Sequence, residues 1–122
     1  MYQEPMKHHD LLLVSNLLRQ KPHGAVRLTG CTEGPLLRGV IRLYPMPRGI
    51  LLAAEISGLP KGIFFNLDIE GESPLFPLVS VRGRVLQVMV VGDCTVEDLM
   101  GKEVILSCPE SQRVLARGCV CP

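Results

Sequence analysis

From residue 24 to the C-terminus, apolar and polar residues alternate with a period of two, in short runs separated by turn signals. The clearest run is 37–43, in which Leu37, Gly39, Ile41 and Leu43 alternate with Arg38, Val40 and Arg42. Such alternation is typical of strands with one buried face. The runs predict about eight strands, at 25–29, 37–43, 50–56, 65–69, 75–81, 84–91, 103–108 and 114–121. Because an open sheet would leave its edges unprotected, we expect an all-β barrel or sandwich.

The segment before residue 24 does not follow this period. Residues 1–9 are polar and predict a loose tail, whereas Asp10 is placed to cap a short helix that ends before Pro22. The helix would carry a broad apolar stripe made of Leu11, Val14, Leu17 and Leu18. An extended arm is the alternative structure for this segment. We therefore divide the chain into an N-terminal tail with a helix or arm at 1–23 and one β-barrel domain at 24–122.

Local signals also predict where the strands are interrupted. Thr95, followed three residues later by Asp98, predicts a capped helical turn that stops at Gly101. Proline and glycine cluster at 45–49 and 57–62, which predicts turns at both places.

The composition indicates one cytoplasmic domain. The 122 residues are 47% hydrophobic, which is enough for a core, and the net charge is +1 with no basic stripe. Two tyrosines and three phenylalanines are too scattered to stack on bases, so we expect no nucleic-acid partner. No apolar run reaches about 18 residues, so we expect no membrane span. Five cysteines, an odd number without a disulfide spacing, favour reduced thiols in the cytoplasm.

Five segments carry a family resemblance. They are LLRQKPHGAVRLTG at 17–30, GVIRLY at 39–44, AAEISGLPKG at 53–62, TVEDLMGKEVILS at 95–107 and VLARGCV at 114–120. Together they span most of residues 17–121, and their order resembles the copper/zinc superoxide dismutase family, specifically its short bacterial members. The resemblance implies an eight-stranded Greek-key barrel.

The chain departs from that family at the metal ligands. By the resemblance, Asp68 and Glu70 stand in the places of two copper-binding histidines, and Ser107 stands in the place of a third. Both long loops of the family are cut short, after Gly71 and at 109–112. The family's two metal sites need more histidines than this chain has. Its three histidines are His8, His9 and His23, and all of them precede the barrel. We therefore expect a non-enzymatic domain with a degenerate metal site, no dismutase activity and no cofactor.

Carboxylates and thiols suggest other sites, each with a simpler explanation. Asp68, Glu70 and Asp93 could offer oxygens to a hard cation, but a polar outer strand face already accounts for the first two. A nucleophile at Ser107 or Cys108 would have no histidine base in the barrel.

The cysteines near the C-terminus form the remaining candidate site. Cys119 and Cys121 are one residue apart, so they point to the same face of a strand. With Cys108 they could bind a soft metal or act as a redox pair. Small buried or terminal thiols without a function are the alternative.

Loss of both loops should uncover part of the barrel's outer face. The residues near the cut are Phe64, Leu75, Phe76 and Pro77. Strand 84–91 is apolar on both faces, so it needs a cover from the N-terminal segment or from another subunit. The segment 11–18 is accordingly either that cover or a docking element.

These observations predict a homodimer or a complex with another protein partner. We interpret the chain as a non-catalytic structural or protein-interaction module. The alternative is a metal-binding or thiol-dependent protein that uses Asp68 and Glu70, or the C-terminal cysteines.

Overall fold

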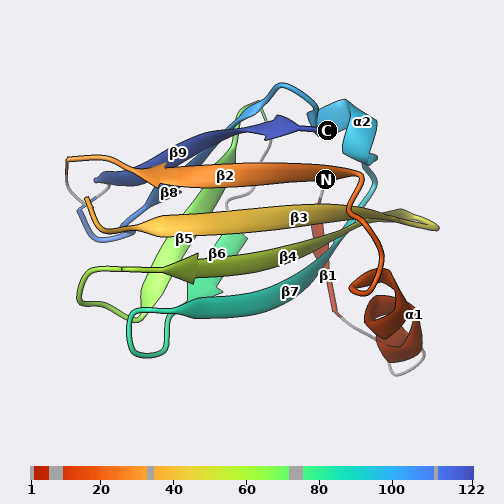
Figure 1. Cartoon of the computed structure of the whole chain (residues 1–122), viewed down its shortest axis with the longest axis horizontal. Helices are drawn as coiled ribbons and strands as arrows, with labels where there is room; N and C mark the ends of the chain where they lie inside the picture. Colours follow the sequence, from red (N-terminus) through yellow and green to blue (C-terminus); the bar gives the residue numbers. More distant parts are fainter. Residues whose placement is uncertain (1, 6–9, 33–34, 72–75, 112) are drawn as a thin grey trace.

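The computed structural model describes residues 2–5, 10–32, 35–71, 76–111 and 113–122, and places nine strands and two helices there (Figure 1). In chain order the elements are β1 (Tyr2–Glu4), α1 (Asp10–Leu17), β2 (Gly24–Gly30), β3 (Arg38–Met46), β4 (Gly49–Ser57), β5 (Phe64–Ile69), β6 (Phe76–Val79), β7 (Val85–Gly92), α2 (Val96–Leu99), β8 (Glu103–Ser107) and β9 (Val114–Cys121). The prediction of an all-β fold with a short N-terminal helix is confirmed.

The nine strands form one antiparallel sheet that curls into a nearly closed barrel (Figure 1). The strand order is β1-β7-β4-β3-β2-β9-β8-β5-β6. Hairpins join β2 to β3 and β3 to β4, whereas the chain leaves β4 to reach β5 on the far side of the sheet. The strands β6 and β7 lie near opposite ends of this order and still contact each other. Curling the sheet thus leaves short edges at β1 and β6, which limits pairing with other chains.

One side chain bridges the seam between β6 and β7. The Gln87 amide of β7 accepts a hydrogen bond from the Val79 N–H at 3.0 Å and donates one to the Pro77 carbonyl at 3.0 Å. Alternate residues of a strand direct their N–H groups to the same edge. At the seam edge of β6, residue 77 is a proline without an N–H, and the N–H of Val79 is bonded to Gln87. Between residues 77 and 79, this edge therefore presents no unused donor to another strand.

The core lies inside the barrel. Every strand from β2 to β9, together with α2, contributes buried apolar residues to one cluster. The bulkiest of these side chains, Phe65 of β5 and Phe76 of β6, are each 1% exposed. The alternation read from the sequence produces this arrangement, because successive side chains of a strand point to opposite faces of the sheet.

Helix α1 covers part of the outer face of the barrel. Its residues Val14 and Leu17 are 7% and 8% exposed. They pack against Tyr44 of β3 and Val90 of β7. The segment is therefore a helix and not an extended arm, and it supplies part of the cover that the two-sided apolar strand β7 requires. Leu86, toward the other end of β7, is still 80% exposed.

The prediction of a loose tail is wrong for residues 2–4. These residues form β1, in which Tyr2 lies opposite Gly92 and Glu4 lies opposite Val90 of β7. Three residues held by backbone pairing need no apolar alternation, so their sequence carries no strand signal. Residues 1 and 6–9 of the predicted tail, and the predicted cap by the Asp10 side chain, lie outside what the structure describes.

The predicted capped turn after β7 is present as α2. The Thr95 hydroxyl accepts a hydrogen bond from the Asp98 N–H at 3.2 Å, and the Thr95 N–H donates to the Asp98 carboxylate at 3.0 Å. Gly101 follows with φ +80°, a left-handed conformation that favours glycine. Neither helix in the described residues is long and apolar enough to cross a membrane.

The turn between β3 and β4 is tighter than predicted. Residues 47 and 48 form it, because Met46 and Gly49 already pair in the β3–β4 ladder. Pro45 is tolerated inside β3 because β2 begins at Gly24, opposite Leu43, and leaves residue 45 without a partner on that side. Gly49 is required at the start of β4, since a Cβ there would lie 2.0 Å from the Val91 carbonyl oxygen.

Candidate functional site

The predicted lost-ligand positions Asp68 and Ser107 share one outer face of the barrel. Asp68 of β5 is half-buried and lies opposite Ile105 of β8. Ser107 of β8 lies opposite Asn66 of β5. Asp68 and Ser107 are therefore diagonal neighbours across the ladder, a separation at which only long side chains touch.

Glu70 is exposed and has a structural partner. It follows the last residue of β5, and its carboxylate accepts a hydrogen bond from the Glu103 N–H at 3.0 Å. Its own N–H donates to the Glu103 carbonyl at 2.9 Å. Both groups extend the β5–β8 pairing past Ile69. The carboxylate thus holds the start of β8, a role that accounts for an acidic side chain here without a metal.

Asp93 lies at a different place in the fold. It is exposed, it follows β7 with φ +61°, and its N–H donates to the Arg48 carbonyl of the β3–β4 hairpin at 3.1 Å. Among the described residues, no three histidine, cysteine, aspartate or glutamate side chains gather into a group that could hold a metal ion. The structure therefore does not bring Asp68, Glu70 and Asp93 together as a cation site.

The cysteines divide into a pair and three separate thiols, and none of the five, all of which the structure describes, forms a disulfide. Cys119 and Cys121 are exposed on the outer face of β9, where they line a hollow of about 380 Å³ together with Arg27. Cys108 follows β8 at the other end of β9, where its N–H donates to the Arg113 carbonyl at 3.0 Å. At about 3.4 Å per residue along β9, Cys108 is on the order of 20 Å from the pair. The predicted set of three thiols is therefore not assembled, whereas the Cys119–Cys121 pair shares one face.

Of the three histidines, His23 is the one that the structure describes. It is exposed just before β2, and its backbone N–H donates to the Leu43 carbonyl at 2.9 Å. His8 and His9 lie outside the described residues. No described strand of the barrel carries an imidazole.

A group of exposed apolar side chains gathers on β5, β6 and the residues beside them. This group, which we call the β5–β6 patch, consists of Ile63, Phe64, Val79 and Val81, at 60%, 61%, 46% and 67% exposure. Phe64 lies opposite Val79 in the β5–β6 ladder. The Ser80 N–H donates to the Ile63 carbonyl at 2.7 Å, which holds the two chain segments side by side beyond the ladder. Phe64, Val79 and Val81 therefore lie on one outward side of β5 and β6, and Ile63 is exposed beside them at the end of the ladder.

The sequence located this surface only in part. Phe64 and Pro77 are exposed as predicted. Phe76 is instead buried in the core, because it and Leu78 point to the inner side of β6 while Pro77 points outward. Leu75 lies outside the described residues. Val79 and Val81 were missed, although they follow Pro77 at steps of two and so share its outward side.

Scanned against models of known protein families and searched against curated proteins, the chain matches none of them.

Proposed function

We propose that this chain is a non-catalytic protein-interaction domain built on a barrel related to that of the copper/zinc superoxide dismutases. The observation that carries the proposal is the β5–β6 patch. Single exposed apolar side chains are ordinary on protein surfaces, whereas a contiguous group of large ones marks a surface that gains free energy when a partner covers it. Phe64 is the natural anchor of such a contact, because aromatic side chains contribute the most buried area.

The strand order supports the kinship. When β1 is left aside, β5, β6 and β7 follow one another around the barrel, and β8 returns to lie beside β5. This return is the crossover of a Greek key. It agrees with the family that the segments 53–62 and 95–107 resemble. Fold kinship does not transmit activity, which depends on the residues of the site.

The side chains at the ligand positions support the loss of catalysis. Asp68 and Ser107 would offer oxygens, which suit hard cations better than copper. Glu70 already binds the backbone of β8. We therefore expect no dismutation of superoxide after incubation of the purified chain with copper and zinc, measured against a metal-only control. Activity that stays with the protein after gel filtration would contradict this expectation.

The seam geometry supports contact through side chains. Partners that add a strand to a sheet need free N–H groups along its edge. At the seam edge of β6, Pro77 has no N–H and the Val79 N–H is bonded to Gln87. At this end of the sheet, the apolar side chains of the β5–β6 patch remain as the means of contact, either with a second copy of this chain or with another protein.

A photoreactive amino acid in place of Phe64 tests the proposal in the producing cell. We expect one discrete crosslinked product from position 64 and none from the same residue placed at the exposed Gln20, which lies just after α1. A product of twice the 13.4 kDa chain mass identifies a second copy, and any other mass identifies a heteromeric partner. The absence of a discrete product at both Phe64 and Val79 would set the proposal aside.

One observation favours a second function, soft-metal or thiol chemistry at the C-terminus. Cys119 and Cys121 point to the same side of β9, both exposed, beside the hollow that Arg27 also lines. Two thiolates suit soft metals. Elemental analysis of protein purified without a histidine tag tests this function. A stoichiometric metal that disappears in Cys119→Ser/Cys121→Ser would support it, and metal-free protein would count against it.

A further inference from the structure

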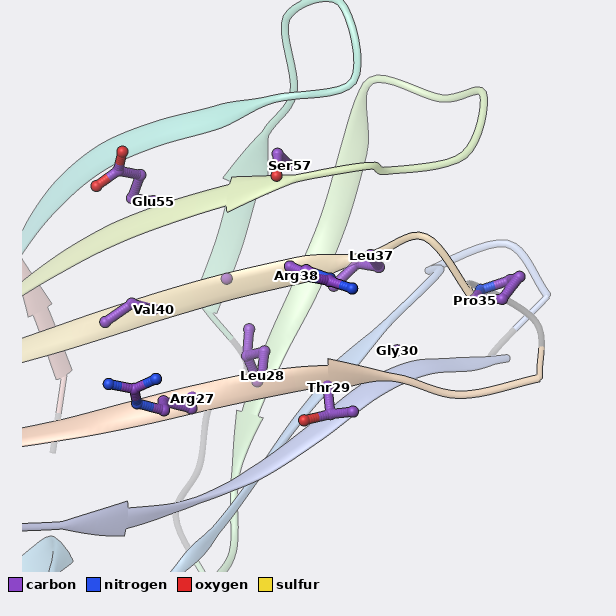
Figure 2. Close-up of a pocket in the computed structure, with 11 residues that line it drawn as sticks. Arg27, Leu28, Thr29, Gly30, Pro35, Leu37, Arg38, Val40, Glu55 and Ser57 are labelled. Atoms are coloured by element: carbon purple, nitrogen blue, oxygen red, sulfur yellow. The ribbon is translucent and has the colours of Figure 1, made fainter.

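We infer that the outer face of β2, β3 and β4 binds an extended acidic segment of a partner protein, through Arg27 and Arg38. This surface is separate from the β5–β6 patch, and the inference does not depend on the proposed function. The face carries a shallow groove of about 630 Å³, which we call the arginine groove (Figure 2). Its polar and apolar lining includes Arg27 and Thr29 from β2, Arg38 and Val40 from β3, and Glu55 and Ser57 from β4.

The register of the sheet builds the groove from residues far apart in sequence. Arg38 lies directly opposite Thr29 on one side and Ser57 on the other. In the next row, Val40 lies between Arg27 and Glu55. Arg27 and Arg38 are therefore diagonal neighbours on adjacent strands, about 7–8 Å apart at their backbones. Val40 provides an apolar floor beside them.

The charges of this face are not balanced. Arg42 pairs with Glu55 at 3.5 Å, and Arg117 of β9 pairs with Glu103 at 3.1 Å. Among the described residues, Arg27 and Arg38 make no ion pair, and both are exposed. Arg27, Arg38 and Arg42 against Glu55 thus leave an excess of two positive charges on β2, β3 and β4, whereas the whole chain carries +1. The two uncommitted guanidinium groups can each take a carboxylate in a two-pronged hydrogen bond.

The spacing of the two arginines selects an extended ligand. In an extended chain, residues two apart point to the same side and lie about 7 Å apart. A segment with acidic residues at every second position therefore matches the diagonal from Arg27 to Arg38. The Thr29 and Ser57 hydroxyls that flank Arg38 can donate to the same carboxylates. Strands β2 and β3 are each paired on both sides, so the segment must be held by side chains and not by strand addition.

The lining also argues against other anions. Nucleic-acid strands are held by bases stacked on aromatic rings as well as by charge, and the residues that line the arginine groove include no aromatic residue. Small-molecule anions are usually enclosed in a deep pocket, whereas this groove is open and shallow. An acidic protein segment, which brings its own additional contacts, fits an open charged surface best.

Nuclear magnetic resonance titration of the full chain at low salt tests the inference. The probe is a six-residue peptide of alternating glutamate and threonine, compared with the same peptide carrying glutamine in place of glutamate. We expect shifts centred on Thr29, Arg38 and Ser57 with the glutamate peptide, and none with the glutamine peptide. Raising the salt should weaken binding, because exposed charges are screened.

Matched variants identify the residues. Arg27→Glu/Arg38→Glu should weaken binding by at least about tenfold. Arg48→Glu/Lys61→Glu, which makes the same change in net charge at exposed positions elsewhere, should change it less than about twofold. Three results would overturn the inference: no shifts at these residues, equal weakening by both variants, or tighter binding of inorganic phosphate or single-stranded DNA at the same residues.

Discussion

Replacing Gln87 by alanine should weaken the seam between β6 and β7. The substitution removes two hydrogen bonds of 3.0 Å, one from the Val79 N–H and one to the Pro77 carbonyl. Each bond contributes about 0.5–1.5 kcal/mol net. Val79 is 46% exposed, so water can solvate the freed N–H and little desolvation cost is added. We expect the free energy of unfolding to fall by about 1–3 kcal/mol, and Tm to fall by about 4–12 °C.

Three further variants separate hydrogen bonding from packing. Gln87→Met keeps the length of the side chain without its amide, and should lose as much stability as alanine. Gln87→Asn keeps the amide on a shorter stem that does not reach both partners, and should also approach the alanine value. Gln20→Ala, at an exposed position after α1, serves as the control and should change stability by less than about 0.5 kcal/mol.

Urea unfolding followed by circular dichroism measures the change. The midpoint should fall while the slope stays constant, because the surface exposed on unfolding is unchanged. In hydrogen-exchange measurements, the Val79 amide should exchange faster in Gln87→Ala than in the wild type. The exchange rates of the β7 amides should change less. If Gln87→Met is as stable as the wild type, or if the Val79 amide keeps its protection, the seam is held by packing and the reasoning is refuted.

Four other substitutions test the packing of the fold. Leu17→Asp should release α1 from the barrel and lower the free energy of unfolding by about 2 kcal/mol. Binding of a hydrophobic dye should increase while the β-sheet circular dichroism signal stays intact. A fully unfolded chain would contradict the reading that α1 only covers the barrel. Thr95→Ala removes the cap of α2 and should cost about 1 kcal/mol in thermal unfolding, so an unchanged Tm would count against the capping box. Ser80→Ala should be neutral or stabilising by up to about 1 kcal/mol, since the buried Ser80 hydroxyl has no hydrogen-bond partner in the described chain; a clear loss would indicate a partner. Gly118→Ala should cost about 1–3 kcal/mol in urea unfolding, because a Cβ there would lie 2.4 Å from the Arg27 carbonyl oxygen, and a stable variant would show that β2 and β9 can separate.

Local patterns in the sequence accounted for most of the elements. The alternation predicted the eight strands β2 to β9, and the Thr95–Asp98 spacing predicted the capped turn α2. Both signals depend on neighbours within a few residues, so a single chain segment contains them. The errors also have local causes. Strand β1 pairs with β7 through a segment that lacks apolar alternation. Pro45 continues β3 because β2, the neighbouring strand on one side, pairs with β3 only as far as Leu43.

The candidate surfaces depended on contacts that no segment contains by itself. Alternation indicates that Arg27 and Arg38 point outward, but only the β2–β3 register places them diagonally beside each other. In the same way, the sequence indicated an exposed Phe64, whereas the β5–β6 pairing set Val79 next to it. The sequence alone therefore determined for most strand positions which residues face in or out, with Phe76 as an exception. The tertiary structure decided which outward residues meet, because strand order and register are set by packing across the whole barrel.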